Sequence, residues 1–210
     1  PPPFFQAEDG IRDALVGLVG SEMCIRDRHR SGADCRFCDT DFVGTDGRGG
    51  GKFADAHSLA SRLASYWPAS GQGKPYVVFT GGEPLLQLDR SLVDAMHDAG
   101  FEVAVETNGT LAAPAGIDWL CVSPKGHNPL VQQAGDELKL VFPQEGLDPE
   151  RFLTLGFNYF YLQPMDRSAM NPGEAETGEA VPSSQLCTEY CLRHPGWRLS
   201  LQTHKYLGIR

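Results

Sequence analysis

The stretch Tyr76-Val77-Val78-Phe79-Thr80-Gly81-Gly82-Glu83-Pro84 joins a short apolar run to a polar turn. The run is rich in β-branched and aromatic residues and is bounded by Pro75 and Gly81, which predicts a strand buried on both faces. Such strands are typical of parallel sheets with crossover helices. The polar residues directly after the run predict a site at the carboxyl end of the strand, where parallel α/β folds build their active sites.

The rest of the chain alternates strand and helix patterns around this stretch. Further strands are expected over residues 101–107, 117–123, 137–142, 158–163 and 197–203. Helices are expected after the cap Asp55, with Leu59, Leu63 and Tyr66 as the apolar face, after the cap Asp89 up to Gly100, and from about Ser183 to His194. This alternation predicts an α/β fold, as an open layer or a barrel, in one domain.

Composition excludes several classes of protein. The 210 residues, 41% of them hydrophobic, are enough to bury a core without disulfides. The formal net charge of −9 argues against a nucleic-acid binder, and no run of 18 apolar residues predicts a membrane span. Six cysteines are too few for a secreted disulfide scaffold, so we expect a reducing compartment, the cytoplasm.

The first 28 residues do not fit the rest of the chain. FFQAEDGIRD and SEMCIRDR resemble peptides that arise when sequencing-adapter DNA is translated into a gene fragment. We therefore interpret residues 1–28 as a non-native segment and residues 29–210 as the core domain. Cys24 falls in this segment and carries no argument.

Polar motifs follow most of the expected strands. They are Thr80-Gly81-Gly82-Glu83-Pro84, Glu106-Thr107-Asn108-Gly109, Ser123-Pro124-Lys125, Gln163-Pro164-Met165-Asp166 and Gln202-Thr203-His204-Lys205. Each motif alone reads as a turn with a helix cap. Because the carboxyl ends of parallel strands share one edge of a sheet, the five motifs together predict one site.

The cysteines suggest metal chemistry only at one place. Cys35-Arg36-Phe37-Cys38 sets two thiols three positions apart, close enough to hold one metal centre. Zinc would need two further ligands, such as Cys187 and Cys191. Those two residues lie four positions apart on a predicted helix and Cys121 lies in a predicted strand, so we interpret all three as packed in the core.

These motifs in this order resemble the radical S-adenosylmethionine superfamily and, within it, the 7-carboxy-7-deazaguanine synthase family. The resemblance rests on Cys35-Arg36-Phe37-Cys38 followed by Asp39-Thr40-Asp41-Phe42, and on the strand-end motifs through the terminal Gln-Thr-His-Lys-Tyr-Leu. It extends over about residues 30–210. It implies a partial (β/α) barrel of the radical S-adenosylmethionine type with a reduced helix set, lacking its native first strand here.

The resemblance also implies roles for single residues. Cys35 and Cys38 match two of the three cysteines that hold a [4Fe–4S] cluster, and Thr40 matches a ligand of Mg²⁺. Contacts to S-adenosylmethionine are implied for Phe37, Cys38, Asp39, Gly81, Gly82, Glu83, Ser123, Pro124, Lys125, Gln163, Pro164, Met165 and Asp166. In particular, Gly81 to Glu83 are expected to receive the methionine ammonium, with the carboxylate of Glu83 complementing its charge. The substrate is expected at Thr80, His204 and the terminal carboxylate of Arg210.

The implied activity is that of a carbon–nitrogen lyase in queuosine and 7-deazapurine biosynthesis, a tRNA modification pathway. An electron enters the cluster, S-adenosylmethionine is cleaved, and the resulting radical abstracts hydrogen from C6 of 6-carboxy-5,6,7,8-tetrahydropterin. The ring contracts to 7-carboxy-7-deazaguanine with loss of ammonia, while Mg²⁺ holds the substrate carboxylate. The implied partners are the pterin, an electron donor such as a flavodoxin and a second copy in a homodimer, with no nucleic acid and no membrane.

One departure from the family pattern concerns the first cluster cysteine. It is expected to be separated from Cys35 by three residues or by about 14, at positions where this chain has Ser31 and Gly20, and Cys24 fits neither spacing. We therefore expect this chain to lack one cluster ligand and to bind iron incompletely.

Two other functions remain open at this point. One is another small radical S-adenosylmethionine enzyme, similar to an activase, and the other is a non-catalytic zinc-binding module. The histidines His57, His97, His127 and His194 are interpreted as ordinary surface or helix residues.

Overall fold

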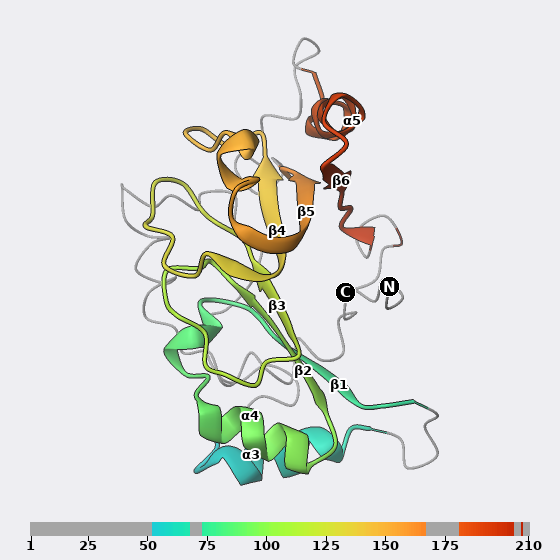
Figure 1. Ribbon diagram of the computed structural model, residues 1–210. Helices are drawn as coiled ribbons and strands as arrows, with labels where there is room; N and C mark the ends of the chain where they lie inside the picture. The colour runs from blue at the N-terminus through green and yellow to red at the C-terminus, as the bar shows by residue number, and fades with distance from the viewer. Residues whose placement is uncertain (1–51, 68–72, 167–180, 204–206, 208–210) are drawn as a thin grey trace.

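A six-stranded, fully parallel sheet forms the centre of the computed structural model, which describes residues 52–67, 73–166, 181–203 and 207. The strands are β1 (Tyr76–Phe79), β2 (Glu102–Thr107), β3 (Trp119–Val122), β4 (Ala134–Phe142), β5 (Gly156–Pro164) and β6 (Trp197–Leu199). Each strand pairs with the next one in the chain, so the sheet is wound in a single direction from β1 to β6 (Figure 1). The predicted parallel α/β fold is confirmed.

The described residues hold three α-helices and two short 3₁₀ helices, of which α3 precedes β1 and the others connect strands. They are α3 (Ala56–Ala64), α4 (Arg90–Asp98), α5 (Ser183–Arg193), η1 (Pro84–Leu86) and η2 (Pro149–Phe152). The connections from β2 to β3 and from β3 to β4 contain no helix. The set of crossover helices is therefore reduced, as predicted, and the sheet is open, as in a partial barrel. Among these elements no helix is both long enough and apolar enough to span a membrane.

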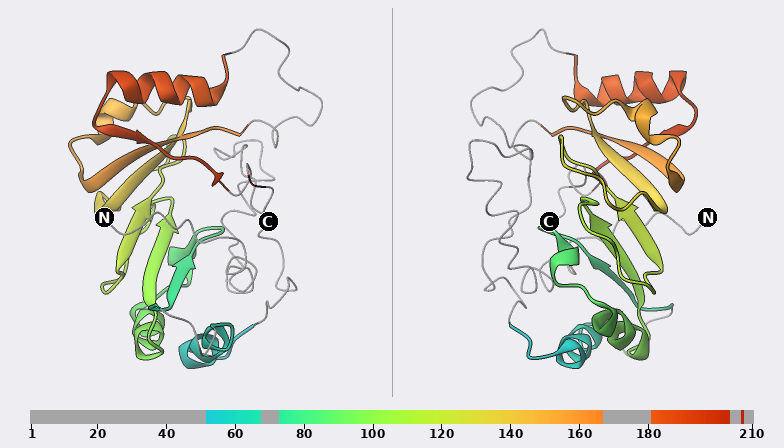
Figure 2. Two further views of the ribbon diagram at one scale, coloured as in Figure 1. Left: turned by 90° about the vertical axis from the view of Figure 1, so that its right-hand side faces the viewer. Right: turned by 60° about the vertical axis from the view of Figure 1, so that its left-hand side comes forward.

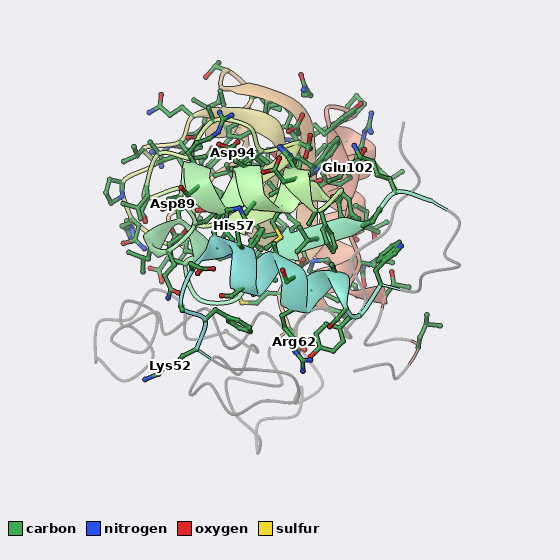
Figure 3. The ribbon with its side chains drawn as sticks, turned by 90° about the horizontal axis from the view of Figure 1, so that it is seen from below. Lys52, His57, Arg62, Asp89, Asp94 and Glu102 are labelled. Carbon is green, nitrogen blue, oxygen red and sulfur yellow. The ribbon has the colours of Figure 1, made fainter. Side chains whose placement is uncertain are left out.

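Local sequence explains where α3 and α4 begin. The Asp55 carboxylate accepts a hydrogen bond from the backbone N–H of Ser58 at 2.7 Å, and the Asp89 carboxylate accepts one from the N–H of Leu92 at 2.9 Å. Gly100, directly after α4, has a φ of +88°, which a glycine adopts without strain. Both predicted N-caps are confirmed. Figure 3 looks onto these two helices from below, with Asp89 at the start of α4.

The prediction that Tyr66 belongs to the buried face of the first helix is wrong. Tyr66 is 48% exposed, whereas Leu59 and Leu63 are buried. The helix ends at Ala64, so Tyr66 lies beyond its last turn and leaves the apolar stripe. Its ring instead lies under the guanidinium of Arg62, whose central carbon is 4.6 Å from the ring centroid.

The two faces of the sheet differ in chemistry. Val103 and Val105 of β2 and Leu138 and Leu140 of β4 are buried in the core beneath the helices. The views in Figure 2 show α3 and α4 at one end of the sheet and α5 at the other. Alternate residues on the same strands, including Glu106, point to the opposite face. The prediction that the first strand is buried on both faces is therefore wrong, since Tyr76 and Val78 on this second face are only half-buried.

The last strand is also shorter than predicted. β6 ends at Leu199 instead of residue 203, although the N–H of Ser200 still donates to the carbonyl oxygen of Leu162 at 2.8 Å. We call the sheet face that carries Thr80, Glu106, Ser123, Lys139 and Gln163 the polar face, and the face under the helices the apolar face.

Candidate active site

The parallel order of the strands brings the carboxyl ends of β1, β2, β3 and β5 to one edge of the sheet. Four of the predicted polar motifs follow these strand ends, so their expected gathering at one edge is confirmed. The fifth motif is described only as far as Gln202 and Thr203.

Glu83 is the most buried polar residue at this edge. Its side chain is 0% exposed, and its Oε1 accepts hydrogen bonds from the hydroxyl of Thr107 at 2.7 Å and the N–H of Leu85 at 3.0 Å. Its Oε2 accepts one from the N–H of Asn108 at 2.8 Å. Burial raises the pKa of Glu83, and these hydrogen bonds and the positive charge of Lys125 oppose the shift. The carboxylate therefore ties the turn after β1 to the turn after β2.

The turn between β1 and Glu83 contains two glycines, Gly81 and Gly82, whose carbonyl oxygens can accept hydrogen bonds from a ligand. Gly81 has a φ of +115°, in the region that only glycine adopts readily, and both Gly81 and Gly82 are half-buried. Within the described residues no backbone N–H donates to the carbonyl oxygen of Gly81 or Gly82. A positively charged group can be received by these two oxygens, so the two glycines fit the predicted ammonium site.

The motif after β3 is tied to its neighbours on both sides. The N–H of Ser123 donates to the carbonyl oxygen of Thr107 at 2.7 Å, and the ammonium of Lys125 donates to the hydroxyl of Ser123 at 2.6 Å. The N–H of Gly126 donates to the side-chain oxygen of Gln144 at 2.8 Å. Gln144 is a residue of this edge that the sequence analysis missed. No local pattern marked it, because its contact with Gly126 joins residues 18 positions apart in the chain.

The motif after β5 lies beside the end of β4. Val141 and Phe142 of β4 are in register with Gln163 and Pro164 of β5, and the N–H of Met165 donates to the carbonyl oxygen of Phe142 at 2.9 Å. Residues 163–166 are all half-buried. They share the edge with Ser123 to Lys125, and the contact of both segments with one ligand stays a prediction.

The polar face carries an ion pair that the sequence analysis did not single out. The ammonium of Lys139 on β4 donates to Oε1 of Glu106 on β2 at 2.9 Å. The hydroxyl of Thr80, the predicted substrate contact, donates to Oε2 of the same carboxylate over a longer distance of 3.5 Å. The polar side chains of three strands thus meet below the edge.

The remaining predicted site residues lie outside the described residues. They are Cys35, Phe37, Cys38, Asp39, Thr40, His204 and Arg210. Their proposed roles toward the cluster, Mg²⁺, S-adenosylmethionine and the substrate therefore stay predictions.

The three described cysteines pack as the sequence analysis expected. Cys121 is 2% exposed and Cys187 is 0% exposed, while Cys191 is half-buried against the core. Burial raises the pKa of the Cys187 thiol to about 12 and holds that of Cys121 well above its ordinary value. No group of three or more His, Cys, Asp or Glu side chains in the described ranges is placed to hold a metal ion. The packing of Cys187 argues against its use as a zinc ligand, since zinc binds the thiolate.

We expect Cys121 and Cys187 to resist alkylation in the folded protein. A thiol with a pKa near 12 is ionised in roughly one molecule in ten thousand at pH 8, and only the thiolate reacts. Iodoacetamide treatment followed by peptide mass spectrometry should leave both residues unmodified before unfolding and label both in urea. Modification of either residue in the native protein at the rate of the unfolded control would contradict the packing.

Comparison with known proteins identifies the family of the chain. The model of the Radical SAM superfamily matches residues 30–137. A 7-carboxy-7-deazaguanine synthase of Bordetella pertussis is 60% identical over 184 residues, which is 88% of this chain and 82% of the relative. The protein of the same name from Caulobacter vibrioides is 55% identical over the same shares of both chains.

A solved structure supports the fold. The crystal structure of QueE from Escherichia coli superposes with a TM-score of 0.51 at 28% sequence identity, over 71% of this chain and 64% of that chain. Because the superfamily model covers half of the chain and the relatives are matched over most of their length, the chain belongs to the radical SAM superfamily and, within it, to the family of 7-carboxy-7-deazaguanine synthases.

Proposed function

We propose that this protein is an enzyme that contracts the ring of 6-carboxy-5,6,7,8-tetrahydropterin to 7-carboxy-7-deazaguanine with loss of ammonia. The observation that carries the proposal is the 60% identity to a 7-carboxy-7-deazaguanine synthase across 82% of that relative. The polar edge of the sheet supports it, because it holds described residues expected to bind S-adenosylmethionine together with Thr80, an expected contact of the pterin. Carbon–nitrogen bond cleavage makes the enzyme a lyase.

The described residues suit the charge pattern of S-adenosylmethionine. The carbonyl oxygens of Gly81 and Gly82 are available to an ammonium group, and Lys125 and Ser123 offer donors to hydroxyl or carboxylate oxygens. Gln163 and the backbone around Met165 stand at the same edge and are expected to meet the adenine and ribose. The residues present therefore fit this group.

We further propose that Cys35 and Cys38 ligate a [4Fe–4S] cluster and that Thr40 ligates Mg²⁺. When bound, the cluster and S-adenosylmethionine supply one-electron chemistry that ordinary side chains lack. The protein's own part is to hold the pterin between Thr80, His204 and Arg210, to orient C6, and to exclude water during the rearrangement. A hydroxyl oxygen such as that of Thr40 suits a hard ion.

The remaining proposals come from the family resemblance. We propose that an electron donor such as a flavodoxin reduces the protein, that it forms a homodimer and that it acts in the cytoplasm. We also propose that residues 29–210 form the catalytic domain. The activase-like alternative lacks support from the relatives, which carry the synthase name across 52–60% identity.

The proposed function is tested by following both substrates in one anaerobic assay. After iron and sulfide reconstitution, we expect 7-carboxy-7-deazaguanine to form, detected by mass spectrometry, only when pterin, S-adenosylmethionine, Mg²⁺ and a reductant are all present. Iron is measured in the same samples, because Ser31 and Gly20 stand where a third cysteine is expected. We expect fewer than four irons per chain and a yield that rises with iron content. S-adenosylmethionine cleavage by iron-loaded protein without loss of pterin would contradict the assignment.

A further inference from the structure

A buried ion pair stands on the polar face of the sheet, apart from the residues to which the family resemblance gives roles. Lys139 and Glu106 lie on β4 and β2, with Cys121 of β3 between the two strands. The side chain of Lys139 is 10% exposed and that of Glu106 is 36% exposed. The side chain of Lys139 is therefore nearly buried, whereas the side chain of Glu106 is partly exposed.

The surroundings keep Lys139 charged. Burial works to lower its pKa, but the carboxylates of Glu106 and Glu137 raise it overall, so the ammonium persists. The ammonium of Lys139 donates a charge-assisted hydrogen bond to the carboxylate of Glu106 at 2.9 Å.

Packing alone does not account for the pair. The same strands build the core on their apolar face from Val105, Leu138 and Leu140 without any charge. Taking the charge of Lys139, 10% exposed, out of water is expensive, and replacing such an ion pair by neutral side chains is often neutral or stabilising. A pair kept at this position therefore points to a role in binding.

The pair reaches the predicted substrate residue through one contact. Oε2 of Glu106 is 3.5 Å from the hydroxyl of Thr80, at the long limit of a hydrogen bond. An ionised carboxylate can only accept, so the Thr80 hydroxyl must donate its proton toward Glu106. The lone pairs of the Thr80 oxygen are then left for a donor on its other side.

We propose that Lys139 and Glu106 are positioning residues: Lys139 holds the Glu106 carboxylate, and the carboxylate directs the Thr80 hydroxyl so that its oxygen accepts a hydrogen bond from an N–H group of the pterin. This inference rests on the proposed function. It goes beyond that function by assigning Thr80 as the acceptor in its hydrogen bond with the pterin. A site of this kind favours substrates that present an N–H donor at that position.

The test measures equilibrium binding instead of turnover. The full chain is titrated anaerobically with 6-carboxy-5,6,7,8-tetrahydropterin in the presence of Mg²⁺ and S-adenosylmethionine but without a reductant. The test variant combines Glu106→Gln with Lys139→Met, which removes both charges. The control combines Glu102→Gln with Lys74→Met, because Lys74 and Glu102 form an exposed pair at a similar distance of 3.0 Å on the same sheet.

We expect the test variant to bind the pterin about tenfold more weakly, since one directed hydrogen bond is lost. Its affinity for S-adenosylmethionine should be unchanged and its melting temperature equal to or above that of the wild type. The control variant should match the wild type in its affinity for the pterin, its affinity for S-adenosylmethionine and its melting temperature. In a Thr80→Val background, which has already lost the hydroxyl, the same double substitution should cost less than about twofold, because coupled residues are not additive.

Other results overturn the inference. Unchanged pterin affinity in the test variant, a full tenfold loss in the Thr80→Val background, or a large fall in melting temperature would each show that the pair does not act through Thr80. If the wild-type chain fails to bind the pterin while it binds S-adenosylmethionine, the proposed function fails together with the inference, which separates that case from the others.

Discussion

The Glu83→Gln variant is expected to unfold with a free energy lower by about 2 kcal/mol or more, even when no ligand is bound. Both carboxylate oxygens of Glu83 accept buried backbone N–H groups, from Leu85 on one side and Asn108 on the other. Whichever way the new amide turns, its NH₂ group faces one of these donors. A neutral amide avoids the cost of burying a charge, but it leaves a buried N–H without an acceptor.

Urea denaturation of the ligand-free protein measures this loss, with Glu102→Gln as the control. Glu102→Gln is the same substitution at an exposed ion pair, so the free energy of unfolding of this variant should stay within about 0.5 kcal/mol of that of the wild type. Thr107→Val removes the hydroxyl that donates to Glu83 at 2.7 Å and that accepts from the N–H of Gly109 at 3.0 Å, so it should cost about 2 kcal/mol.

The same variants separate two roles for Glu83 in ligand binding. If the carboxylate acts by holding the Gly81–Gly82 turn, Thr107→Val should also weaken S-adenosylmethionine binding, although the Thr107 hydroxyl is committed to Glu83. If the carboxylate only contacts the methionine ammonium, we expect another pattern. Glu83→Gln would then bind S-adenosylmethionine more weakly with an unchanged free energy of unfolding, and Thr107→Val would not change the affinity for S-adenosylmethionine.

The second large effect is expected at Gly109, which follows β2 in the predicted Glu-Thr-Asn-Gly motif. Its φ is +78°, and an added Cβ would lie 2.5 Å from Cδ1 of Leu130 and 2.7 Å from Cγ1 of Val122. Its carbonyl oxygen accepts hydrogen bonds from the N–H groups of Val131 and Gln132, so the turn cannot shift freely. Gly109→Ala therefore combines left-handed strain with overpacking and should cost about 3 kcal/mol.

Gly100→Ala is the matched control for this change. Gly100 has a similar φ of +88°, but a Cβ there would meet no atom within 4 Å. Its variant should show the backbone strain alone, about 1 kcal/mol. The difference between the two variants in urea denaturation then measures the clash, and equal losses at both positions would refute it.

Local patterns were enough to predict the helix starts and the strand positions. Asp55 and Asp89 cap helices through contacts three residues away, which a short window of sequence contains. The errors arose where the outcome depends on distant contacts. Tyr66 was expected in the core, but the helix ends before it, and the first strand was expected to be covered on both faces, whereas only its apolar face is.

In the candidate site, too, the residues marked by local sequence could be predicted, and those that depend on distant contacts could not. The glycines, Ser123 to Lys125 and Gln163 to Asp166 could be predicted because each motif directly follows an expected strand. Gln144 was missed because its acceptor role depends on Gly126, 18 residues away in the chain. The ion pair of Lys139 and Glu106 joins residues 33 positions apart, so no local pattern could mark it.

The sequence by itself determined the parallel α/β class, the family and the order of the polar motifs along one edge, because strand pattern, glycine and motif spacing are local properties. Only the tertiary structure decided which side chains meet across strands. Register set Glu106 opposite Cys121 and brought Lys139 within reach, and packing gave the carboxylate of Glu83 three protein donors. Partners of this kind depend on strand register and on the packing of the whole sheet, which no single segment encodes.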